Sequence, residues 1–168
     1  DYDYSIEGEW KKFFDPLTKF WVEYSRDIIG IPKSLAAVPL VSNVIILASI
    51  FDAKIYVPCL DLDFYNSIPE FMNGFINMYP MIEFHYKDAI VCDNILDSKE
   101  YNLNNEEKNS LLYFSGGVDA YTSLTRHENE DLVLLTVCGA DTWYSNKFGF
   151  NEIIRKNKEI ASLHKLPI

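Results

Sequence analysis

The first part of the chain mixes helical and alternating patterns of apolar positions. Residues 2–6 alternate weakly and predict an edge strand, whereas residues 10–24 carry aromatic side chains at helical spacing and predict helical structure, with a second segment starting at Pro16. A long apolar stretch predicts a buried helix over residues 34–52. The segment 53–58 then combines β-branched and aromatic residues with a closing proline, so we expect a short strand to follow that helix.

Another helix is expected to begin at Ser67, because its spacing to Glu70 is that of a capping box. Residues 82–86 and 89–92 alternate as two strands joined by a tight turn. The segment 93–110 is rich in Asn, Asp, Glu and Lys. It is the best candidate for a domain boundary, because such polar segments separate packed elements.

Beyond residue 110 the pattern becomes a regular alternation of strands and helices. It predicts a strand at 111–114, a helix at 118–127, a strand at 131–138 and a helix at 149–164. Continuous apolar strands separated by helices indicate a parallel sheet. The sequence therefore predicts an α/β protein, with a mixed α/β accessory domain in residues 1–110 and the first βαβα part of a Rossmann-like parallel-sheet domain in residues 111–168. The last five residues resemble the approach to a third strand, so we expect the second domain to be truncated.

Composition narrows the functional classes. The chain is 48% hydrophobic, which is typical of a packed globular protein, and its formal net charge is −10. A surface of that sign repels phosphate backbones, so the composition of this segment argues against general binding to nucleic acid.

Cysteine usage and hydropathy argue for a cytoplasmic protein. Cys59, Cys92 and Cys138 lie far apart and form no C-x-x-C pair, so we expect neither a disulfide framework nor a thiolate zinc site. The most apolar run, residues 35–51, is shorter than the ~20 residues that cross a bilayer. The N-terminus lacks the basic and apolar regions of a signal peptide. These patterns predict a reducing compartment and no contact with membranes.

A glycine-rich turn between a predicted strand and the helix after it carries the candidate chemistry. Its residues are Ser115, Gly116, Gly117, Val118 and Asp119. A helix N-terminus presents unpaired amide groups and the positive end of the helix dipole, and glycines let the backbone approach a phosphate closely. Ser115 can add a hydroxyl donor, and Asp119 in the first helical turn can act with Mg²⁺ near the phosphates. The Walker and G-x-G-x-x-G fingerprints are both absent from the sequence.

The segment from Leu112 to Asp119 resembles the S-G-G-x-D-S pyrophosphate loop of the PP-loop ATP pyrophosphatase superfamily. The resemblance implies an adenine nucleotide α-hydrolase fold, whose loop holds the phosphates of ATP while a substrate oxygen attacks the α-phosphorus. The products of that step are an adenylated intermediate and pyrophosphate. Carried over to this chain, the resemblance assigns ATP binding to Ser115, Gly116, Gly117, Val118 and Asp119, with Asp119 also as catalytic residue and Mg²⁺ ligand.

The end of the second predicted strand supplies the rest of the expected nucleotide site. The resemblance implies that adenine lies against Val137, Cys138 and Gly139. Asp141 follows at the carboxyl end of a parallel strand, where α/β proteins build their sites, and is a further candidate for binding the nucleotide. Cys138 is most simply read as a small core residue.

The first 110 residues resemble the N-terminal domain of uncharacterised proteins akin to 7-cyano-7-deazaguanine synthase. The resemblance rests on residues 56–65 and 78–80. It implies no substrate, and the role of this domain stays open.

One position departs from the family pattern, because Ala120 replaces the final Ser or Thr of the motif. The expected function is an ATP-dependent ligase or adenylating enzyme that activates an oxygen of a small molecule or tRNA for attack by nitrogen or sulfur. The alternatives are a degenerate module that binds ATP or AMP without catalysis, which Ala120 favours, and a structural domain with an empty glycine turn. Thr122 and Ser123 are the nearest hydroxyls that could substitute. The acceptor substrate and a homo-oligomeric state stay open.

Other charged residues are more simply explained without a ligand. Asp61 and Asp63 have the spacing of a metal-binding pair but precede a helix, where carboxylates usually act as caps. Arg155, Lys156 and Lys158 could approach phosphates, yet they lie on a polar helix whose default is exposure to solvent.

Overall fold

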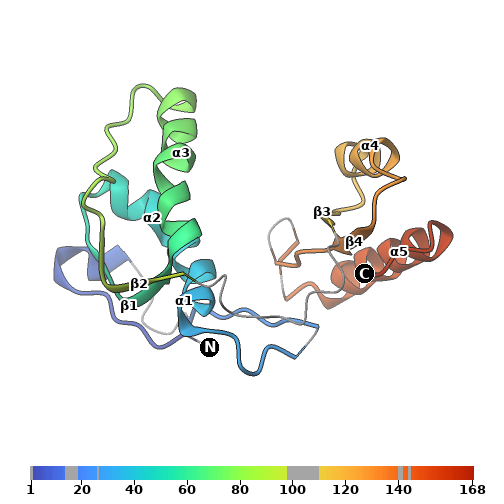
Figure 1. The fold of residues 1–168 in the computed structure, drawn as a ribbon, viewed down its shortest axis with the longest axis horizontal. Helices are drawn as coiled ribbons and strands as arrows, with labels where there is room; N and C mark the ends of the chain where they lie inside the picture. The colour runs from blue at the N-terminus through green and yellow to red at the C-terminus, as the bar shows by residue number, and fades with distance from the viewer. Residues whose placement is uncertain (1, 14–18, 26, 98–109, 140–141, 144) are drawn as a thin grey trace. The chain divides into compact units, whose positions relative to one another are not determined.

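The computed structural model describes residues 2–13, 19–25, 27–97, 110–139, 142–143 and 145–168. The chain divides into two compact units, Asp1–Asn102 and Leu103–Ile168, whose elements are labelled in Figure 1. The sequence placed the division at residue 110. Each unit contains a two-stranded parallel sheet with helices, so the coarse prediction of an α/β protein with parallel strands is confirmed.

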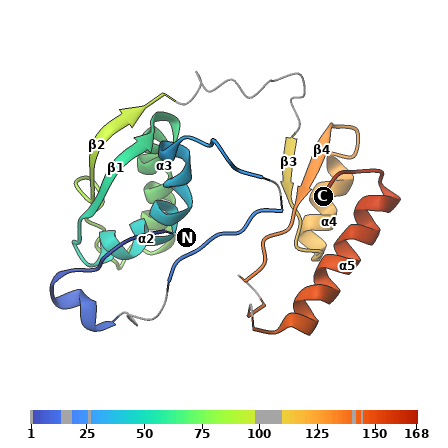
Figure 2. The ribbon, with the colours of Figure 1, turned by 90° about the horizontal axis from the view of Figure 1, so that it is seen from below.

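The first unit is built around one strand–helix–strand crossover. Its elements are the 3₁₀ helix η1 (Gly8–Phe13), α1 (Lys33–Ala36), α2 (Val38–Ile50), β1 (Ile55–Asp61), α3 (Leu62–Met78) and β2 (Ile90–Leu96). Strands β1 and β2 run parallel with Ile55 opposite Ile90, and Figure 2 shows them side by side. A buried cluster joins the helices to this sheet and consists of Ile45, Ile68, Met72 and Ala89.

The predicted helix over residues 34–52 is divided into α1 and α2. Pro39 lies in the first turn of α2, a position where proline costs no backbone hydrogen bond. Residue Ala37 links the two helices, and its N–H donates to the Lys33 carbonyl. Among the described residues, no helix has both the length and the apolar character needed to cross a membrane.

Helix α3 begins at Leu62, before the predicted cap at Ser67, so the predicted start is wrong. Asp61 ends the preceding strand, and its Oδ1 accepts a hydrogen bond from the Phe64 N–H at 2.9 Å. The Ser67 hydroxyl instead donates to the Phe64 carbonyl, and Pro69 lies inside the helix. The N-cap reading of Asp61 is therefore confirmed, because a carboxylate directly after a strand satisfies the first turn of the helix.

Three other predictions for this unit are wrong. Residues 2–6 form no strand. Of the predicted helical stretch 10–24, residues 10–13 lie in the 3₁₀ helix η1, residues 19–24 form no helix, and residues 14–18 lie outside the described part. Residues 82–86 are also not a strand. Their alternation arises because Phe84 packs against the core cluster and the His85 N–H donates to the Ser49 carbonyl at the end of α2. Strand β2 therefore pairs with β1 rather than with a hairpin partner.

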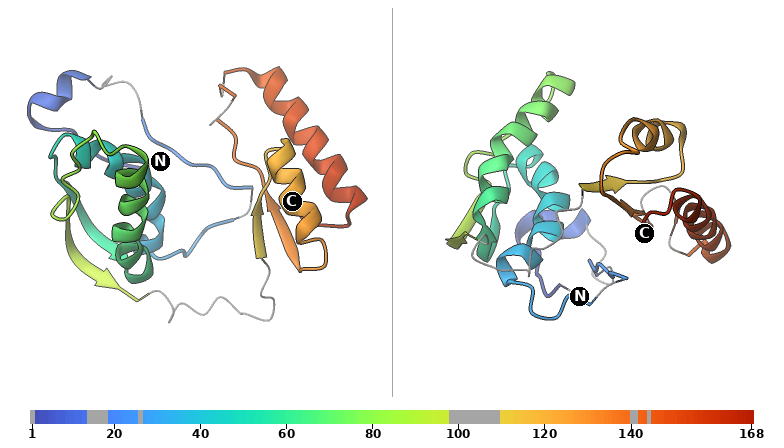
Figure 3. Two further views of the ribbon diagram at one scale, coloured as in Figure 1. Left: turned by 90° about the horizontal axis from the view of Figure 1, so that it is seen from above. Right: turned by 45° about the vertical axis from the view of Figure 1, so that its right-hand side comes forward.

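The second unit follows its predicted order of elements. These are β3 (Ser110–Tyr113), α4 (Val118–Arg126), β4 (Leu132–Leu135) and α5 (Lys147–Leu163). The strands are parallel, with Leu112 opposite Leu134. Both helices contribute to one buried cluster on one side of the strand pair (Figure 3), formed by Phe114, Leu124, Leu132, Leu134 and Ala161.

The end of the chain runs along the outer edge of β4. The Leu134 N–H donates to the Pro167 carbonyl at 2.9 Å, and Leu166 packs against the buried cluster. In a parallel ladder alternate residues bond to opposite neighbours, and Leu135 already bonds to β3 through Phe114. Residue Pro167 therefore lies on the side of β4 that faces away from β3.

The cap of α3 gives a stability test. We expect Asp61→Ala to lower the free energy of unfolding by about 1 kcal/mol, because it removes the side-chain acceptor for the Phe64 N–H. Ser67→Ala is the matched control and should change it by less than about 0.5 kcal/mol, since Ser67 is exposed within the helix. Urea denaturation measures both. A larger loss for Ser67→Ala than for Asp61→Ala would contradict this assignment of the cap.

Candidate functional site

The turn between β3 and α4 is held in a conformation that only glycine adopts readily. Phe114 is buried at the end of β3, and Gly116 has a φ of +83°. A Cβ on Gly116 would lie 2.7 Å from Oδ1 of Asn157, closer than real contacts allow. Both the backbone angle and this neighbour therefore require glycine at position 116.

The N-terminus of α4 leaves its first amide groups open. Gly117 is the N-cap residue and provides no side chain to accept from them. The first intrahelical bond runs from the Tyr121 N–H to the Gly117 carbonyl, so the N–H groups of Val118, Asp119 and Ala120 have no acceptor within the helix. Together with the helix dipole these groups form a positive end that favours an anion.

A depression of about 300 Å³ lies at this end of the helix. Its lining residues come from the turn and from one face of α4: Gly116, Gly117, Val118, Tyr121, Thr122 and Thr125. The structure thus brings three of the predicted site residues to a common hollow. The predicted site residues that do not line it are Ser115, Asp119, Val137 and Gly139.

The hydroxyl groups around the turn are engaged with the backbone. Oγ of Ser115 accepts from the Gly117 N–H at 3.3 Å. Oγ1 of Thr122 donates to the Val118 carbonyl at 2.8 Å. Ala120, where the family motif has a hydroxyl, packs against the buried cluster beneath the turn. Ala120 therefore packs into the core and does not line the depression, whereas Tyr121, Thr122 and Thr125 are the hydroxyl-bearing residues of its lining.

A buried polar network supports the turn from below. The Phe114 carbonyl accepts from Oγ1 of Thr136 at 2.9 Å and from Nδ2 of Asn157 at 3.1 Å. Nδ2 of Asn157 also donates to Oγ1 of Thr136 at 3.0 Å. Asn157 is 1% exposed. Three segments that are distant in the sequence, the end of β3, the end of β4 and the middle of α5, meet at one carbonyl.

Thr136 and Asn157 were not among the residues predicted from the sequence. A signal existed for Asn157, because it lies three and four positions before Ile160 and Ala161, which are on the inner face of α5. A single amide in an apolar stripe indicates a buried hydrogen bond. Thr136 gave no such signal, since threonine is common in strands.

The residues after β4 lie near the same edge of the sheet as the turn between β3 and α4. Thr136 bonds to Phe114, so the chain leaving β4 begins beside the turn. Val137 is 57% exposed, and Gly139 has a φ of +98°. Burial raises the pKa of the Cys138 thiol, which keeps it protonated at neutral pH and argues against a thiolate nucleophile. Asp141 lies outside the described residues.

Asp119 is the acidic residue available to a metal at this turn. It is exposed in the first turn of α4. Mg²⁺ bound to a nucleotide takes one or two carboxylates and completes its shell with phosphate oxygens and waters. A single exposed carboxylate at a helix N-terminus fits that requirement. In the described part of the chain no group of three or more His, Cys, Asp or Glu side chains could hold a metal without a nucleotide.

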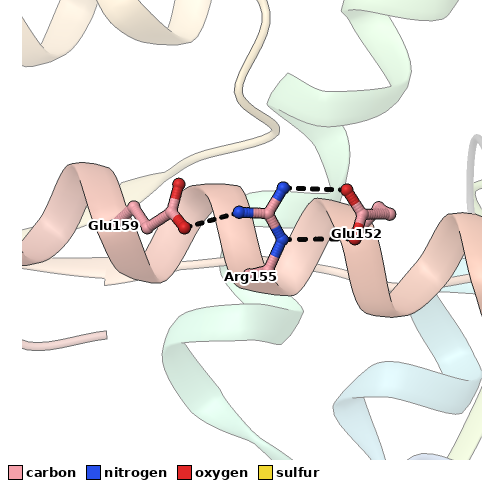
Figure 4. A network of polar contacts seen from close by, with 3 residues as sticks. All are labelled: Glu152, Arg155 and Glu159. Carbon is pink, nitrogen blue, oxygen red and sulfur yellow. Dashed lines mark hydrogen bonds and ion pairs between the residues drawn. The ribbon is translucent and has the colours of Figure 1, made fainter.

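Arg155 belongs to an ion-pair network on the surface of α5 (Figure 4). Its guanidinium donates to both carboxylate oxygens of Glu152, at 2.9 and 3.2 Å, and to Glu159. It stands two positions before Asn157, about 200° around the helix axis, and thus on the opposite face. The structure therefore places Arg155 among carboxylates on the surface, as the default reading of a polar helix predicts.

Models of known protein families, curated proteins and solved structures were compared with this chain, and none matched.

The two glycines of the turn should differ in their tolerance of substitution. We expect Gly116→Ala to cost about 1–2 kcal/mol for the left-handed backbone, and more because Cβ meets Asn157. Gly117→Ala is the matched control and should cost less than about 1 kcal/mol, because its φ of −80° suits any residue. Denaturation of both variants measures the difference. Equal losses would contradict the described turn.

The ion pairs on α5 should affect the titration of the Glu152 carboxyl group. Hydrogen bonding to Arg155 lowers the pKa of Glu152. A lowered pKa in the folded state means that this pair stabilises the fold above the pH where an unfolded glutamate ionises, and that the contribution is lost as the pH falls. We expect the pKa of Glu152, followed by NMR of its side-chain carboxyl carbon, to rise in Arg155→Gln. An unchanged pKa would show that the pair does not persist in solution.

Proposed function

We propose that the second unit binds ATP at the turn between β3 and α4. The observation that carries the proposal is a glycine that the fold does not require. Gly117 has a φ open to any residue, and a Cβ there would meet only Oγ of Ser115, at an ordinary 3.4 Å. Serine or aspartate would cap the helix at this position. Glycine instead leaves the backbone accessible to a closely approaching phosphate.

In this proposal the amide groups at the start of α4 donate to phosphate oxygens. Asp119 would be the residue that holds Mg²⁺, and the ion would supply neutralisation of charge on the phosphates. The exposed segment at Val137 and Gly139 offers backbone groups to the adenine, as the resemblance to PP-loop proteins implies. Asp141 is the remaining residue that we propose for binding the nucleotide.

The proposed reaction is adenylation in the manner of PP-loop ATP pyrophosphatases. An oxygen of an acceptor attacks the α-phosphorus, and the bond from the α-phosphorus to the bridging oxygen breaks and releases pyrophosphate. A nitrogen or sulfur nucleophile then displaces AMP from the acceptor. Such a step needs positioning and charge stabilisation rather than a nucleophilic side chain. All three cysteines are free, which agrees with a reducing, cytoplasmic setting.

A second candidate is binding of ATP or AMP without turnover. It is favoured by Ala120, which packs into the core where the family motif has a hydroxyl. In that case the same turn holds the nucleotide as a structural or regulatory ligand.

Calorimetry with the full chain separates these functions. We expect ATP with Mg²⁺ to bind, and ATP at ~100 times its Kd to raise the free energy of unfolding by ~2.7 kcal/mol. Asp119→Asn should weaken binding in Mg²⁺ but not in EDTA, because it removes a metal ligand and not an amide donor. Glu128→Gln, which replaces an exposed carboxylate beyond the end of α4, is the matched control.

Incubation with α-labelled ATP and candidate acceptors then tests catalysis. Formation of AMP and pyrophosphate in the wild type and its loss in Asp119→Asn support the adenylating enzyme. Binding without either product selects the second candidate. If no adenine nucleotide stabilises the protein, both candidate functions are overturned and the glycine turn is a structural element without a ligand.

A further inference from the structure

We infer that Thr136 and Asn157 are positioning residues that fix the glycine turn in its ligand-ready conformation. The inference rests on the proposed function for its ligand, but its structural part concerns the turn alone. Within the glycine motif a single long hydrogen bond spans Gly116, from the Gly117 N–H to Oγ of Ser115 at 3.3 Å. Glycine populates many conformations with similar energy, so we infer that contacts from outside the motif help to hold Gly116 at a φ of +83°.

The Phe114 carbonyl is the point at which the turn is fixed. The N–H of Phe114 continues the strand ladder by donating to the Leu135 carbonyl at 2.8 Å. Its carbonyl points out of the ladder and accepts from Thr136 and Asn157. The peptide plane before Phe114 is thus held by its N–H, and the plane that leads into Ser115 is held by two donors at its carbonyl, so the direction in which the chain leaves β3 is determined.

The orientation of the Asn157 amide follows from the same contacts. A carbonyl oxygen can only accept, so Nδ2 must face Phe114, and the second hydrogen of Nδ2 reaches Oγ1 of Thr136. Oδ1 then necessarily points toward Gly116, where it occupies the space that a Cβ would need. Asn157 therefore anchors the Phe114 carbonyl at the start of the turn and also limits the conformations of Gly116.

A turn fixed in this way binds an anion more tightly, because the cost of ordering the loop has been met during folding. Loss of either donor should release the Phe114 peptide and let Gly116 sample other conformations. The open amide groups of α4 would remain, but the glycine backbone would no longer be aligned with them.

The test uses two substitutions at one position of the full chain. Thr136→Val keeps the branched shape and removes the hydroxyl, whereas Thr136→Ser keeps the hydroxyl. We expect Thr136→Val to weaken binding of ATP with Mg²⁺ at least tenfold and to displace the amide NMR resonances of Gly116 and Gly117 without ligand. Thr136→Ser should restore both. A second variant, Asn157→Asp, retains the shape but as a carboxylate cannot donate to Phe114, and should behave like Thr136→Val.

The two readouts separate this inference from the proposed function. If the wild type binds no ATP, the proposed function fails, while displaced glycine resonances in Thr136→Val that recover in Thr136→Ser still support positioning. The inference would be overturned if the Gly116 and Gly117 resonances and the affinity for ATP stay unchanged in both Thr136→Val and Asn157→Asp. Equal losses in Thr136→Val and Thr136→Ser would also overturn it, because they would assign the effect to packing.

Discussion

The hydrogen bonds to the Phe114 carbonyl are the constraint on which the second unit depends. A strand that ends in a buried residue must satisfy its last carbonyl before the chain can turn, since an unpaired buried carbonyl is costly. Thr136 and Asn157 satisfy it from β4 and α5. The same bonds therefore close the parallel strand pair, dock α5 on it and set the path of the glycine turn.

Each sheet is covered by helices on one side in the described part of the chain. In the second unit Leu132 and Leu134 are buried under α4 and α5, while Leu111 is 57% and Tyr113 is 68% exposed. In the first unit Tyr56 is 75% exposed. Parallel strands normally bury both faces, which explains why these strands read as continuously apolar although one face is open here.

The sequence was most informative where local and tertiary signals agree. In the second unit apolar strands, a glycine turn and an amphipathic helix follow one another, and the elements lie close to their predicted ranges. In the first unit the signals conflict. Ser67 has the spacing of a cap, but Asp61 caps first, and the alternation around Phe84 reflects packing of a loop against a core. The turn was visible because its residues are contiguous, whereas Thr136 and Asn157 support it from distant segments.

The two sides of α4 have different polarity because they meet different neighbours. Ala120 and Leu124 face the core, and Thr122 and Thr125 line the depression. Each threonine hydroxyl donates to a carbonyl one turn earlier, so its oxygen is left as an acceptor. The end of the helix therefore offers amide donors, and its flank offers acceptors. A bare anion would use only the donors, whereas the proposed nucleotide would also offer ribose hydroxyl groups to the threonine oxygens.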